Sequence, residues 1–254
     1  IEQIRSDFFT KITHEFRSPL TVILGLSGQL KEKQHLSPQN VGAYLNAIDR
    51  QGKNLLNLVN QLQDIARLKT STNTMEWKTG NIVAYVGMIA ETFKLYAKEK
   101  SIELIFYSSE TTIETDFVPD YINKIIENLL SNAIKYSREG DKIHILIERK
   151  AKDNEKVQIK VCDTGEGISK ENLNRIFDIF YQVNNSKEKM GSGVGLTLVK
   201  ELVEILKGKI WAESKIGEGS TFIVELPIWR NEKHIFSYWL PDEFSKYPIG
   251  EKEL

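Results

Sequence analysis

The sequence predicts an α+β protein: a helical hairpin that forms a dimeric four-helix bundle, followed by an α/β sandwich domain with a mixed sheet. Up to about residue 68, apolar residues recur every three or four positions, as they do in amphipathic helices. From residue 75 onward, helical stretches alternate with strand-like runs, and several runs follow one another without a helix between them. The polar stretch 69–74 is the predicted linker between domains 1–68 and 75–228.

The first predicted helix runs from the start of the chain to about Lys31 and places a histidine on its exposed face. Ile12 and Phe16 belong to the apolar stripe, and His14 lies two positions from each, so it is turned by about 200° from both. Because helical spacing is present from the first residues, we expect this helix to continue upstream. A solvated histidine without special chemistry is the ordinary interpretation of such a position.

Three neighbours of His14 bear on its chemistry. Glu15 follows it directly, and Ser18 lies one helical turn later on the same face. Pro19 has no N–H for the carbonyl of Glu15, so it predicts a bend just past the histidine. A neutral imidazole is a competent nucleophile, and an adjacent carboxylate can take its proton.

The second predicted helix begins with Ser37 as N-cap and Pro38 in its first turn, and ends near residue 68. Its apolar residues alternate four and three positions apart, as in a heptad seam. Leu58 and Ile65 widen this seam beyond what one partner helix would cover. A two-fold homodimer would bury the wide stripe in a four-helix bundle, and packing of the hairpin on the rest of the chain is the alternative.

Composition limits the possible classes of function. The 254 residues are 41% hydrophobic and 27% charged, as expected for a globular protein, and the formal net charge of -1 does not indicate nucleic-acid binding. No apolar run is long enough to span a membrane, so we expect membrane contact only through upstream segments. The single cysteine, Cys162, permits no internal disulfide and fits a reducing, cytoplasmic location.

The second domain is predicted to contain both helices and strands. The predicted helices cover 81–100, 120–137, 170–175 and 195–207. The predicted strands cover 102–107, 113–117, 142–149, 156–162, 209–213 and 220–226.

The helix at 120–137 carries two amides and an ammonium group on one face. Asn128, Asn132 and Lys135 are spaced four and three positions apart, so they project together. Amide oxygens are hard ligands that Mg²⁺ accepts alongside phosphates, and a lysine can balance phosphate charge. A solvated polar helix face is the alternative.

Two glycine-containing segments follow. In VCDTGEGI (161–168), Asp163 ends a strand and could accept hydrogen bonds from an exocyclic amine, while Gly165 and Gly167 permit close approach of a flat ligand. An ordinary Asp-Gly turn is the alternative. In GSGVGL (191–196), alternate glycines precede a helix, so backbone N–H groups and the helix N-terminus could bind phosphates. The polar segment 181–190 before it is predicted to be a mobile lid.

These motifs together resemble those of the sensor histidine kinases of two-component systems. THEFRSPL, around His14, resembles the H box of the phosphotransfer domain. IENLLSNAIKYS resembles the N box, IFDIFYQ (176–182) the F box, and DTGEGI, GSGVGL and GEGSTF (217–222) the three glycine boxes. They stand in the family's order and cover residues 8–226.

The resemblance implies a Bergerat-type ATP-binding domain, shared with the gyrase, Hsp90 and MutL group, that phosphorylates His14 from ATP. Glu15 would be its acid/base partner, and the phosphoryl group would pass to an aspartate of a response regulator receiver domain, separate or fused. Ser18 stands where the family's phosphatase motif usually has Thr or Asn, and its hydroxyl could still orient water for dephosphorylation of the regulator.

The resemblance also implies a set of nucleotide contacts. Asn128 and Asn132 would hold Mg²⁺, and Asp163 would bind the adenine amino group. The remaining ATP-binding residues would be Lys135, Tyr136, Gly165, Gly167, Ile168, Gly191, Gly193, Gly195, Leu196 and Ser220.

Two other functions remain open on the sequence, as does the role of the end of the chain. A non-catalytic dimeric scaffold could use ATP as a switch, although the intact set of His14, Glu15, Asn128, Asn132 and Asp163 argues against it. A related ATPase could hydrolyse ATP without a histidine acceptor, although the H box argues against that. Transfer within or between protomers is also left open. The aromatic-rich extension 229–254 is expected to pack on the ATP-binding domain or to lead into a further domain, such as a receiver.

Overall fold

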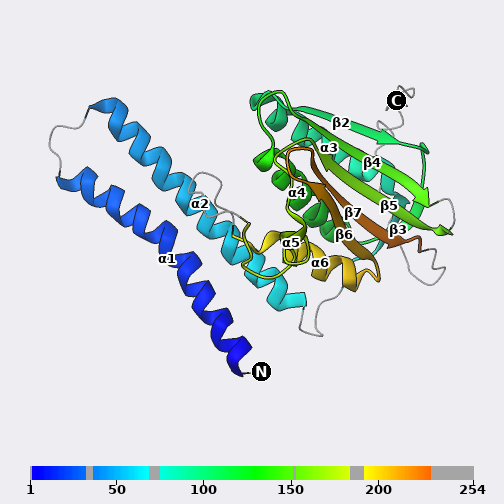
Figure 1. The fold of residues 1–254 in the computed structure, drawn as a ribbon, viewed down its shortest axis with the longest axis horizontal. Coiled ribbons are helices and arrows are strands. Elements are labelled where there is room, and N and C mark those ends of the chain that lie inside the picture. Colours follow the sequence, from blue (N-terminus) through cyan, green and yellow to red (C-terminus); the bar gives the residue numbers. More distant parts are fainter. Residues whose placement is uncertain (1, 33–36, 69–74, 151–152, 184–191, 230–254) are drawn as a thin grey trace.

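A computed structural model describes residues 2–32, 37–68, 75–150, 153–183 and 192–229. The predicted linker 69–74, most of the predicted lid and nearly all of the C-terminal extension lie outside these ranges. The first two helices, α1 (Glu2–Glu32) and α2 (Pro38–Leu68), form the predicted hairpin (Figure 1). The side chain of Ser37 accepts a hydrogen bond from the N–H of Asn40 (3.4 Å), which confirms it as the N-cap of α2. None of the described helices has the length and apolar character that a bilayer crossing requires.

The remaining elements form a second unit, here called the sheet domain. Its helices are α3 (Ile82–Glu99), α4 (Pro119–Tyr136), α5 (Lys170–Leu173) and α6 (Gly195–Ile205). Its strands are β1 (Lys78–Asn81), β2 (Glu103–Ser108), β3 (Glu114–Phe117), β4 (Lys142–Lys150), β5 (Asp153–Asp163), β6 (Lys209–Lys215) and β7 (Gly219–Pro227). Every predicted helix and strand is present. The strand that was not predicted, β1, has the sequence KTGN, which carries no strand pattern and depends on pairing with β3.

The main sheet is mixed, as predicted. Its strand order is β2-β4-β5-β7-β6, with β2 parallel to β4 and the other neighbours antiparallel. Helices α3, α4 and α6 lie on one face of this sheet (Figure 1). The result is the two-layer α/β sandwich that consecutive strands without crossover helices indicate.

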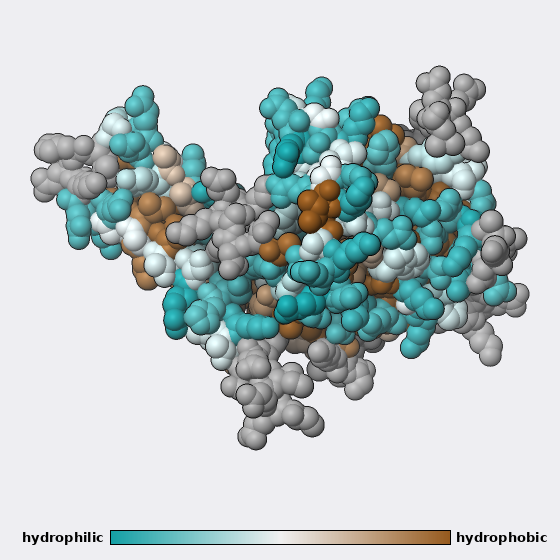
Figure 2. Space-filling view, viewed as in Figure 1, coloured by the Kyte–Doolittle hydropathy of each residue, from teal (hydrophilic) through white to brown (hydrophobic). Residues whose placement is uncertain are grey.

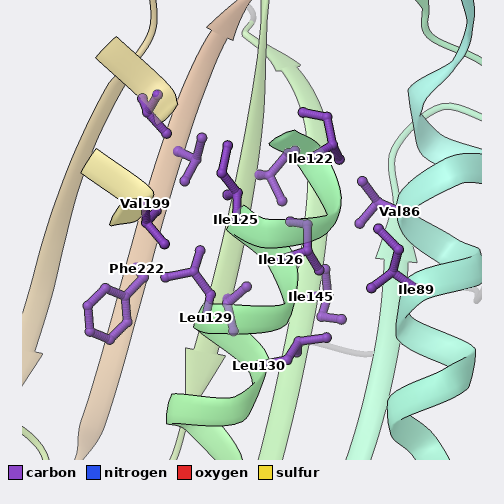
Figure 3. Close-up of a cluster of buried hydrophobic side chains, with 14 of the residues drawn as sticks. Val86, Ile89, Ile122, Ile125, Ile126, Leu129, Leu130, Ile145, Val199 and Phe222 are labelled. Atoms are coloured by element: carbon purple, nitrogen blue, oxygen red, sulfur yellow. The ribbon is translucent and has the colours of Figure 1, made fainter. Parts of the chain in front are cut away.

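Helix α4 is the centre of the hydrophobic core. In Figure 3 its side chains Ile122, Ile126 and Leu129 meet side chains from α3, α6 and the sheet, and all three are fully buried. Each such side chain contributes about 1.5–3 kcal/mol by leaving water. Because the apolar face of α4 is held in this way, its polar face, with Asn128 and Asn132, must point away from the sheet.

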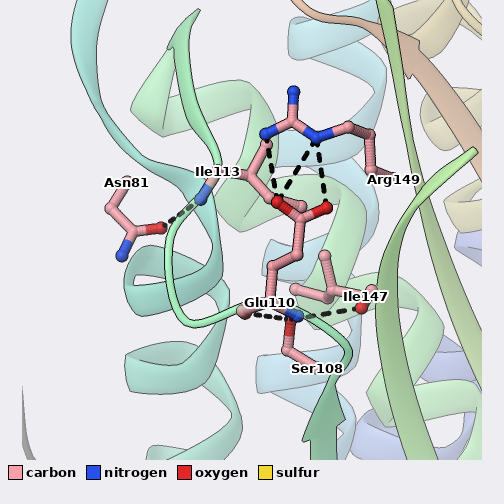
Figure 4. A network of polar contacts seen from close by, with 6 residues as sticks. All are labelled: Asn81, Ser108, Glu110, Ile113, Ile147 and Arg149. Atoms are coloured by element: carbon pink, nitrogen blue, oxygen red, sulfur yellow. Dashed lines mark hydrogen bonds and ion pairs between the residues drawn. The ribbon is translucent and has the colours of Figure 1, made fainter. Parts of the chain in front are cut away.

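A polar network ties the segment before β3 to its neighbours (Figure 4). The guanidinium of Arg149 donates to both carboxylate oxygens of Glu110, at 3.1 and 3.2 Å. The side chain of Asn81 caps α3 by accepting the N–H of Val83, and it also accepts the N–H of Ile113, each at 3.1 Å. These bonds fix the start of α3 relative to the sheet.

The hairpin packs on the sheet domain through α2, which lies beside α6. Leu58 and Ile65 are only 3% and 6% exposed and belong to the same cluster of buried side chains as the core of the sheet domain. Between the two units, Lys124 of α4 forms an ion pair with Asp64 of α2 at 2.9 Å. Packing on the rest of the chain therefore accounts for part of the width of the α2 stripe.

Candidate functional site

The predicted phosphoacceptor region lies on α1, where Ile12 and Phe16 pack against the buried hydrophobic cluster. His14 and Ser18 are exposed, whereas Glu15 is half-buried. Burial raises the pKa of Glu15, while hydrogen bonding by the Gln182 side chain and the charge of His14 act in the opposite direction. Gln182 was not singled out from the sequence, although it closes the IFDIFYQ motif.

Asp163 is a buried carboxylate at the end of β5. Its Oδ1 accepts the backbone N–H of Gly165 at 3.0 Å and that of Ser220 at 3.2 Å. Burial raises the pKa of Asp163, and the two hydrogen bonds partly offset that rise. The bonds hold one oxygen in place, and a carboxylate oxygen has further lone pairs with which to accept from a ligand.

The glycines around Asp163 have no room for a side chain. A Cβ on Gly165 would lie 2.5 Å from the carbonyl oxygen of Tyr136, and one on Gly167 would lie 2.1 Å from that of Lys215. Gly219 was not singled out, yet its φ is 105° and a Cβ there would lie 1.9 Å from the Asp163 carbonyl oxygen. The two glycines of the GEGSTF motif, Gly217 and Gly219, are the sequence signal that could have pointed to this position.

Ser220 and Ile168 are joined through a serine that the motifs do not include. Ser214 of β6 accepts the N–H of Ile168 at 2.7 Å and donates to the carbonyl of Gly219 at 2.7 Å. Its hydroxyl also lies 3.0 Å from the hydroxyl of Ser220. No local pattern marks Ser214, because its partners come from two other segments.

The two N-box asparagines differ in their surroundings. Asn128 donates from Nδ2 to the Lys124 carbonyl at 2.6 Å, and its Oδ1 accepts from Nε2 of Gln61 at 3.3 Å. Asn132 is half-buried, and its amide makes no hydrogen bond within the described part of the chain. Lys135 and Tyr136, the two further residues of α4 predicted to contact the nucleotide, follow Asn132 in the last turn of the helix. The ammonium of Lys135 lies 4.8 Å from the ring centre of Tyr136.

The second glycine box lies next to Asn128. Gly191 is outside the described residues, whereas Gly193 and Gly195 are in place, and a Cβ on Gly195 would lie 2.6 Å from Oδ1 of Asn128. Leu196 is half-buried in the first turn of α6. Ser192 donates from its hydroxyl to Oε1 of Gln61 at 2.8 Å. Gln61, on α2, thus contacts both the N box and the second glycine box.

The predicted metal ligands are amides. Among the described residues, no group of three or more His, Cys, Asp or Glu side chains could hold a metal ion. Asn132 offers an amide oxygen without a hydrogen bond among the described residues, one helical turn beyond Asn128 on α4. Mg²⁺ accepts few protein ligands when phosphates supply the others. The residues present fit a magnesium ion bound together with a nucleotide.

A cavity of about 450 Å³ lies elsewhere in the sheet domain. It lies between α3 and α4, and Tyr85, Asn123 and Glu127 are among its lining residues. None of the predicted nucleotide contacts lines it. It is therefore distinct from the predicted ATP site.

Two family models match the chain. The His Kinase A (phospho-acceptor) domain matches residues 4–71, and the Histidine kinase-, DNA gyrase B-, and HSP90-like ATPase matches residues 117–230. Among curated proteins, Histidine kinase P4 of Formosa agariphila is 34% identical over 263 residues, which cover 100% of this chain and 19% of that protein. The chain thus spans about a fifth of the length of that relative.

Solved structures of histidine kinases also resemble this chain. Full-length ShkA in complex with AMPPNP has a TM-score of 0.64 at 26% identity, with 89% of this chain and 46% of that chain covered. Histidine kinase ThkA in complex with the response regulator protein TrrA has a TM-score of 0.73 at 24% identity, with 89% and 62% covered, and supports the fold. With a phospho-acceptor domain over the hairpin and an ATPase domain over the sheet domain, this chain belongs to the histidine kinase family.

Proposed function

We propose that this chain is the catalytic core of a sensor histidine kinase, which transfers the γ-phosphoryl group of ATP to His14 and then to an aspartate of a response regulator. The observation that carries this proposal is the position of Gln61 on the hairpin, where it donates to Asn128 of the N box at 3.3 Å and accepts from Ser192 of the second glycine box at 2.8 Å. These bonds join the hairpin that bears His14 to the segments that hold the ATP-site motifs.

We assign adenine binding to Asp163 and the backbone groups of Gly165 and Ser220 that are hydrogen-bonded to it. Its carboxylate would accept the exocyclic amine of the base, and Gly165 and Gly167 would line the pocket because neither position has room for a Cβ. Ile168, Leu196 and Ser220 complete the proposed base-binding region. The buried, oriented carboxylate is suited to an amine donor, since no reorganisation is needed on binding.

Phosphate binding is assigned to the N box and the second glycine box. Asn128 and Asn132 would hold Mg²⁺, which neutralises phosphate charge when bound, and Lys135 and Tyr136 would contact the nucleotide. Gly191, Gly193 and Gly195 would present backbone N–H groups at the N-terminus of α6. Asn128 must release Gln61 to use its oxygen in this way.

The proposed transfer step needs one nucleophile and one base. A neutral ring nitrogen of His14 attacks the γ-phosphorus, a nitrogen–phosphorus bond forms, and the bond to the bridging oxygen of ADP breaks. The proton on the other ring nitrogen passes to the carboxylate of Glu15. Beyond these two groups, the step requires in-line positioning of the γ-phosphoryl group and neutralisation of the phosphate charge.

The partners and boundaries are part of the same proposal. The division at 69–74 separates the phosphotransfer hairpin from the ATPase domain, and a homodimer forms through the hairpin. Figure 2 shows hydrophobic side chains along the hairpin, where Leu24 and Leu56 are 69% and 59% exposed. The regulator would dock on this hairpin in the cytoplasm, and the exposed hydroxyl of Ser18 could orient water for its dephosphorylation.

The test is incubation with γ-labelled ATP and Mg²⁺, with acid-labile, base-stable label on the protein as the measurement. We expect label on the wild type and none on His14→Gln or Asn132→Ala. Nucleotide binding should survive in His14→Gln, which separates loss of the acceptor from loss of the ATP site. Label that persists in His14→Gln would move the acceptor elsewhere, and binding without label in the wild type would favour the scaffold.

A further inference from the structure

A serine outside the motifs lies between the two segments that surround Asp163. Resting on the proposed function, we propose that Ser214 determines base specificity: it accepts the hydroxyl proton of Ser220, so that Ser220 faces the base with lone pairs only. The site then offers acceptors to an exocyclic amine and no donor to a carbonyl oxygen. Ser214 does not touch the nucleotide in this assignment, and it acts as a positioning residue through Ser220.

The hydroxyl of Ser214 has three contacts, which use its whole hydrogen-bonding capacity. A hydroxyl has one proton to donate and two lone pairs with which to accept. The carbonyl oxygen of Gly219, 2.7 Å away, can only accept, so it takes the proton of Ser214. The N–H of Ile168, also 2.7 Å away, can only donate, so it takes one lone pair. One lone pair of Ser214 is left for the third contact.

This third contact sets the direction of the Ser220 hydroxyl. The two hydroxyl oxygens lie 3.0 Å apart, and because the proton of Ser214 is already used, Ser220 must be the donor. Ser220 is only 7% exposed, and its backbone N–H donates to Oδ1 of Asp163 at 3.2 Å. Its hydroxyl oxygen keeps two lone pairs, and an ionised carboxylate can only accept. The side chains of Asp163 and Ser220 thus present acceptors alone.

The strand pairing keeps the two serines together. Ser214 of β6 lies directly opposite Ser220 of β7 in the antiparallel register, and Ser220 is also opposite Asp163 of β5. Paired residues on neighbouring strands have side chains close enough to bond. The hydroxyl proton of Ser220 therefore cannot turn toward a ligand without giving up its bond to Ser214.

A site with acceptors alone distinguishes two purine bases of the same shape. Adenine carries an amino group at position 6, which donates, whereas hypoxanthine carries a carbonyl oxygen there, which accepts. Between Asp163 and Ser220 that oxygen would find lone pairs and no donor, so ATP should bind more tightly than inosine triphosphate, ITP. Without Ser214, the Ser220 hydroxyl is free to turn its proton toward such an oxygen.

The experiment is titration of the folded protein with ATP and with ITP, and the measured quantity is the dissociation constant of ITP divided by that of ATP. In Ser214→Ala we expect this ratio to fall about 3- to 10-fold, because ITP gains one hydrogen bond. Ser214→Thr keeps the hydroxyl and should keep the wild-type ratio. An unchanged ratio in Ser214→Ala would overturn the inference.

Ser108→Ala is the matched control for a loss of stability without a change of base preference. Ser108 is a half-buried serine on β2, and its hydroxyl donates to the carbonyl of Glu110 at 2.7 Å and accepts the N–H of the same residue at 3.4 Å. Thermal unfolding of both variants measures the stability lost with each hydroxyl. If Ser108→Ala changed the ratio as much as Ser214→Ala, the effect would be structural and the inference would be wrong.

Removal of the Ser220 hydroxyl tests whether Ser214 acts through it. Ser220→Ala has no lone pairs to offer, so the ratio should fall in this variant too, which keeps the test available should Ser214→Ala not fold. Adding Ser214→Ala to Ser220→Ala should change the ratio no further. A wild-type ratio in Ser220→Ala, or a second fall in the double variant, would overturn the inference.

The wild-type protein separates this inference from the proposed function. ATP binding with a preference over ITP is the expected result. Equal binding of ATP and ITP, together with label on His14, would overturn the inference and leave the kinase assignment in place. Absence of ATP binding would overturn the proposed function and the inference with it.

Discussion

The two ends of the candidate nucleotide site are built differently. At the adenine end, Asp163 is bonded by the backbone N–H groups of Gly165 and Ser220, so every described contact lies within the sheet domain. At the phosphate end, Asn128 and Ser192 are both bonded to Gln61, which belongs to the hairpin. On the proposed assignment, base recognition involves the sheet domain alone, whereas the proposed phosphate end also contacts the hairpin.

The difference has a physical basis. Backbone donors and glycines without room for a Cβ cannot rearrange unless the strands move, so the adenine end is preorganised. A long glutamine side chain can change rotamer, and a net hydrogen bond is worth only about 0.5–1.5 kcal/mol. A domain that must approach and leave its acceptor needs contacts of this second kind.

The largest expected effect comes from breaking the adenine end at Gly219. A Cβ there would lie 1.9 Å from the Asp163 carbonyl oxygen, so Gly219→Ala should displace β5 or β7 and abolish ATP binding. Gly217→Ala is the matched control, because its φ is also positive, at 81°, but nothing lies within 4 Å. It should cost about 1 kcal/mol of stability by backbone strain alone. Thermal unfolding and ATP titration check both, and equal losses would contradict a steric cause.

A smaller effect at the same end is expected for Asp163→Asn. The amide oxygen can still accept the two N–H groups, but the carboxylate that would bind the adenine amine is lost. We expect the ATP dissociation constant to rise about 10- to 100-fold, as for a hydrogen bond to a charged group. Titration of the folded variant with ATP gives the measurement, and unchanged affinity would remove Asp163 from the base site.

The same variant should respond to pH in a defined direction. Burial raises the pKa of Asp163 above its ordinary value of 3.8, so the folded state holds this proton more tightly than the unfolded chain. Stability is then lost as the pH rises through the interval between those two pKa values. Nucleotide-free Asp163→Asn should therefore be more stable than wild type at neutral pH, and the difference in melting temperature should shrink toward pH 4. A constant difference would argue against the raised pKa.

At the phosphate end, Gln61→Ala should strengthen nucleotide binding. It frees Oδ1 of Asn128 and the hydroxyl of Ser192, so we expect the dissociation constant for Mg²⁺-ATP to fall about threefold. Gln63→Ala, an exposed glutamine two positions along α2, serves as control and should change nothing. Weaker binding in Gln61→Ala would mean that Gln61 assists the nucleotide rather than competing with it.

The smallest effect is expected for Asp64→Asn. This change removes the ion pair between Asp64, whose side chain is 22% exposed, and Lys124, whose side chain is 28% exposed. Docking of the hairpin should weaken by no more than about 1 kcal/mol, and by less at high salt. Hydrogen exchange of α2 reports on this docking. Asp49→Asn removes an exposed pair with Lys53 within α2 and provides the comparison. Equal effects would show that the interdomain pair does not hold the hairpin.

Local patterns in the sequence were sufficient for most of the fold. The apolar stripes predict both hairpin helices and α4, because helix formation depends on neighbours three and four positions away. The boxes locate Asp163 and the N-box asparagines, whose roles stay predictions until tested. The pattern could not locate β1, because its four residues form a strand only by pairing with β3.

What the sequence determined by itself is thus the order of the elements and the motifs that carry the chemistry. Only the tertiary structure decided which of them meet: Ser220 with Asp163, 57 positions away, and Gln61 with Asn128, 67 positions away. Such contacts depend on how distant segments pack together. The spacing of residues along the chain does not show which polar side chains that packing brings into contact.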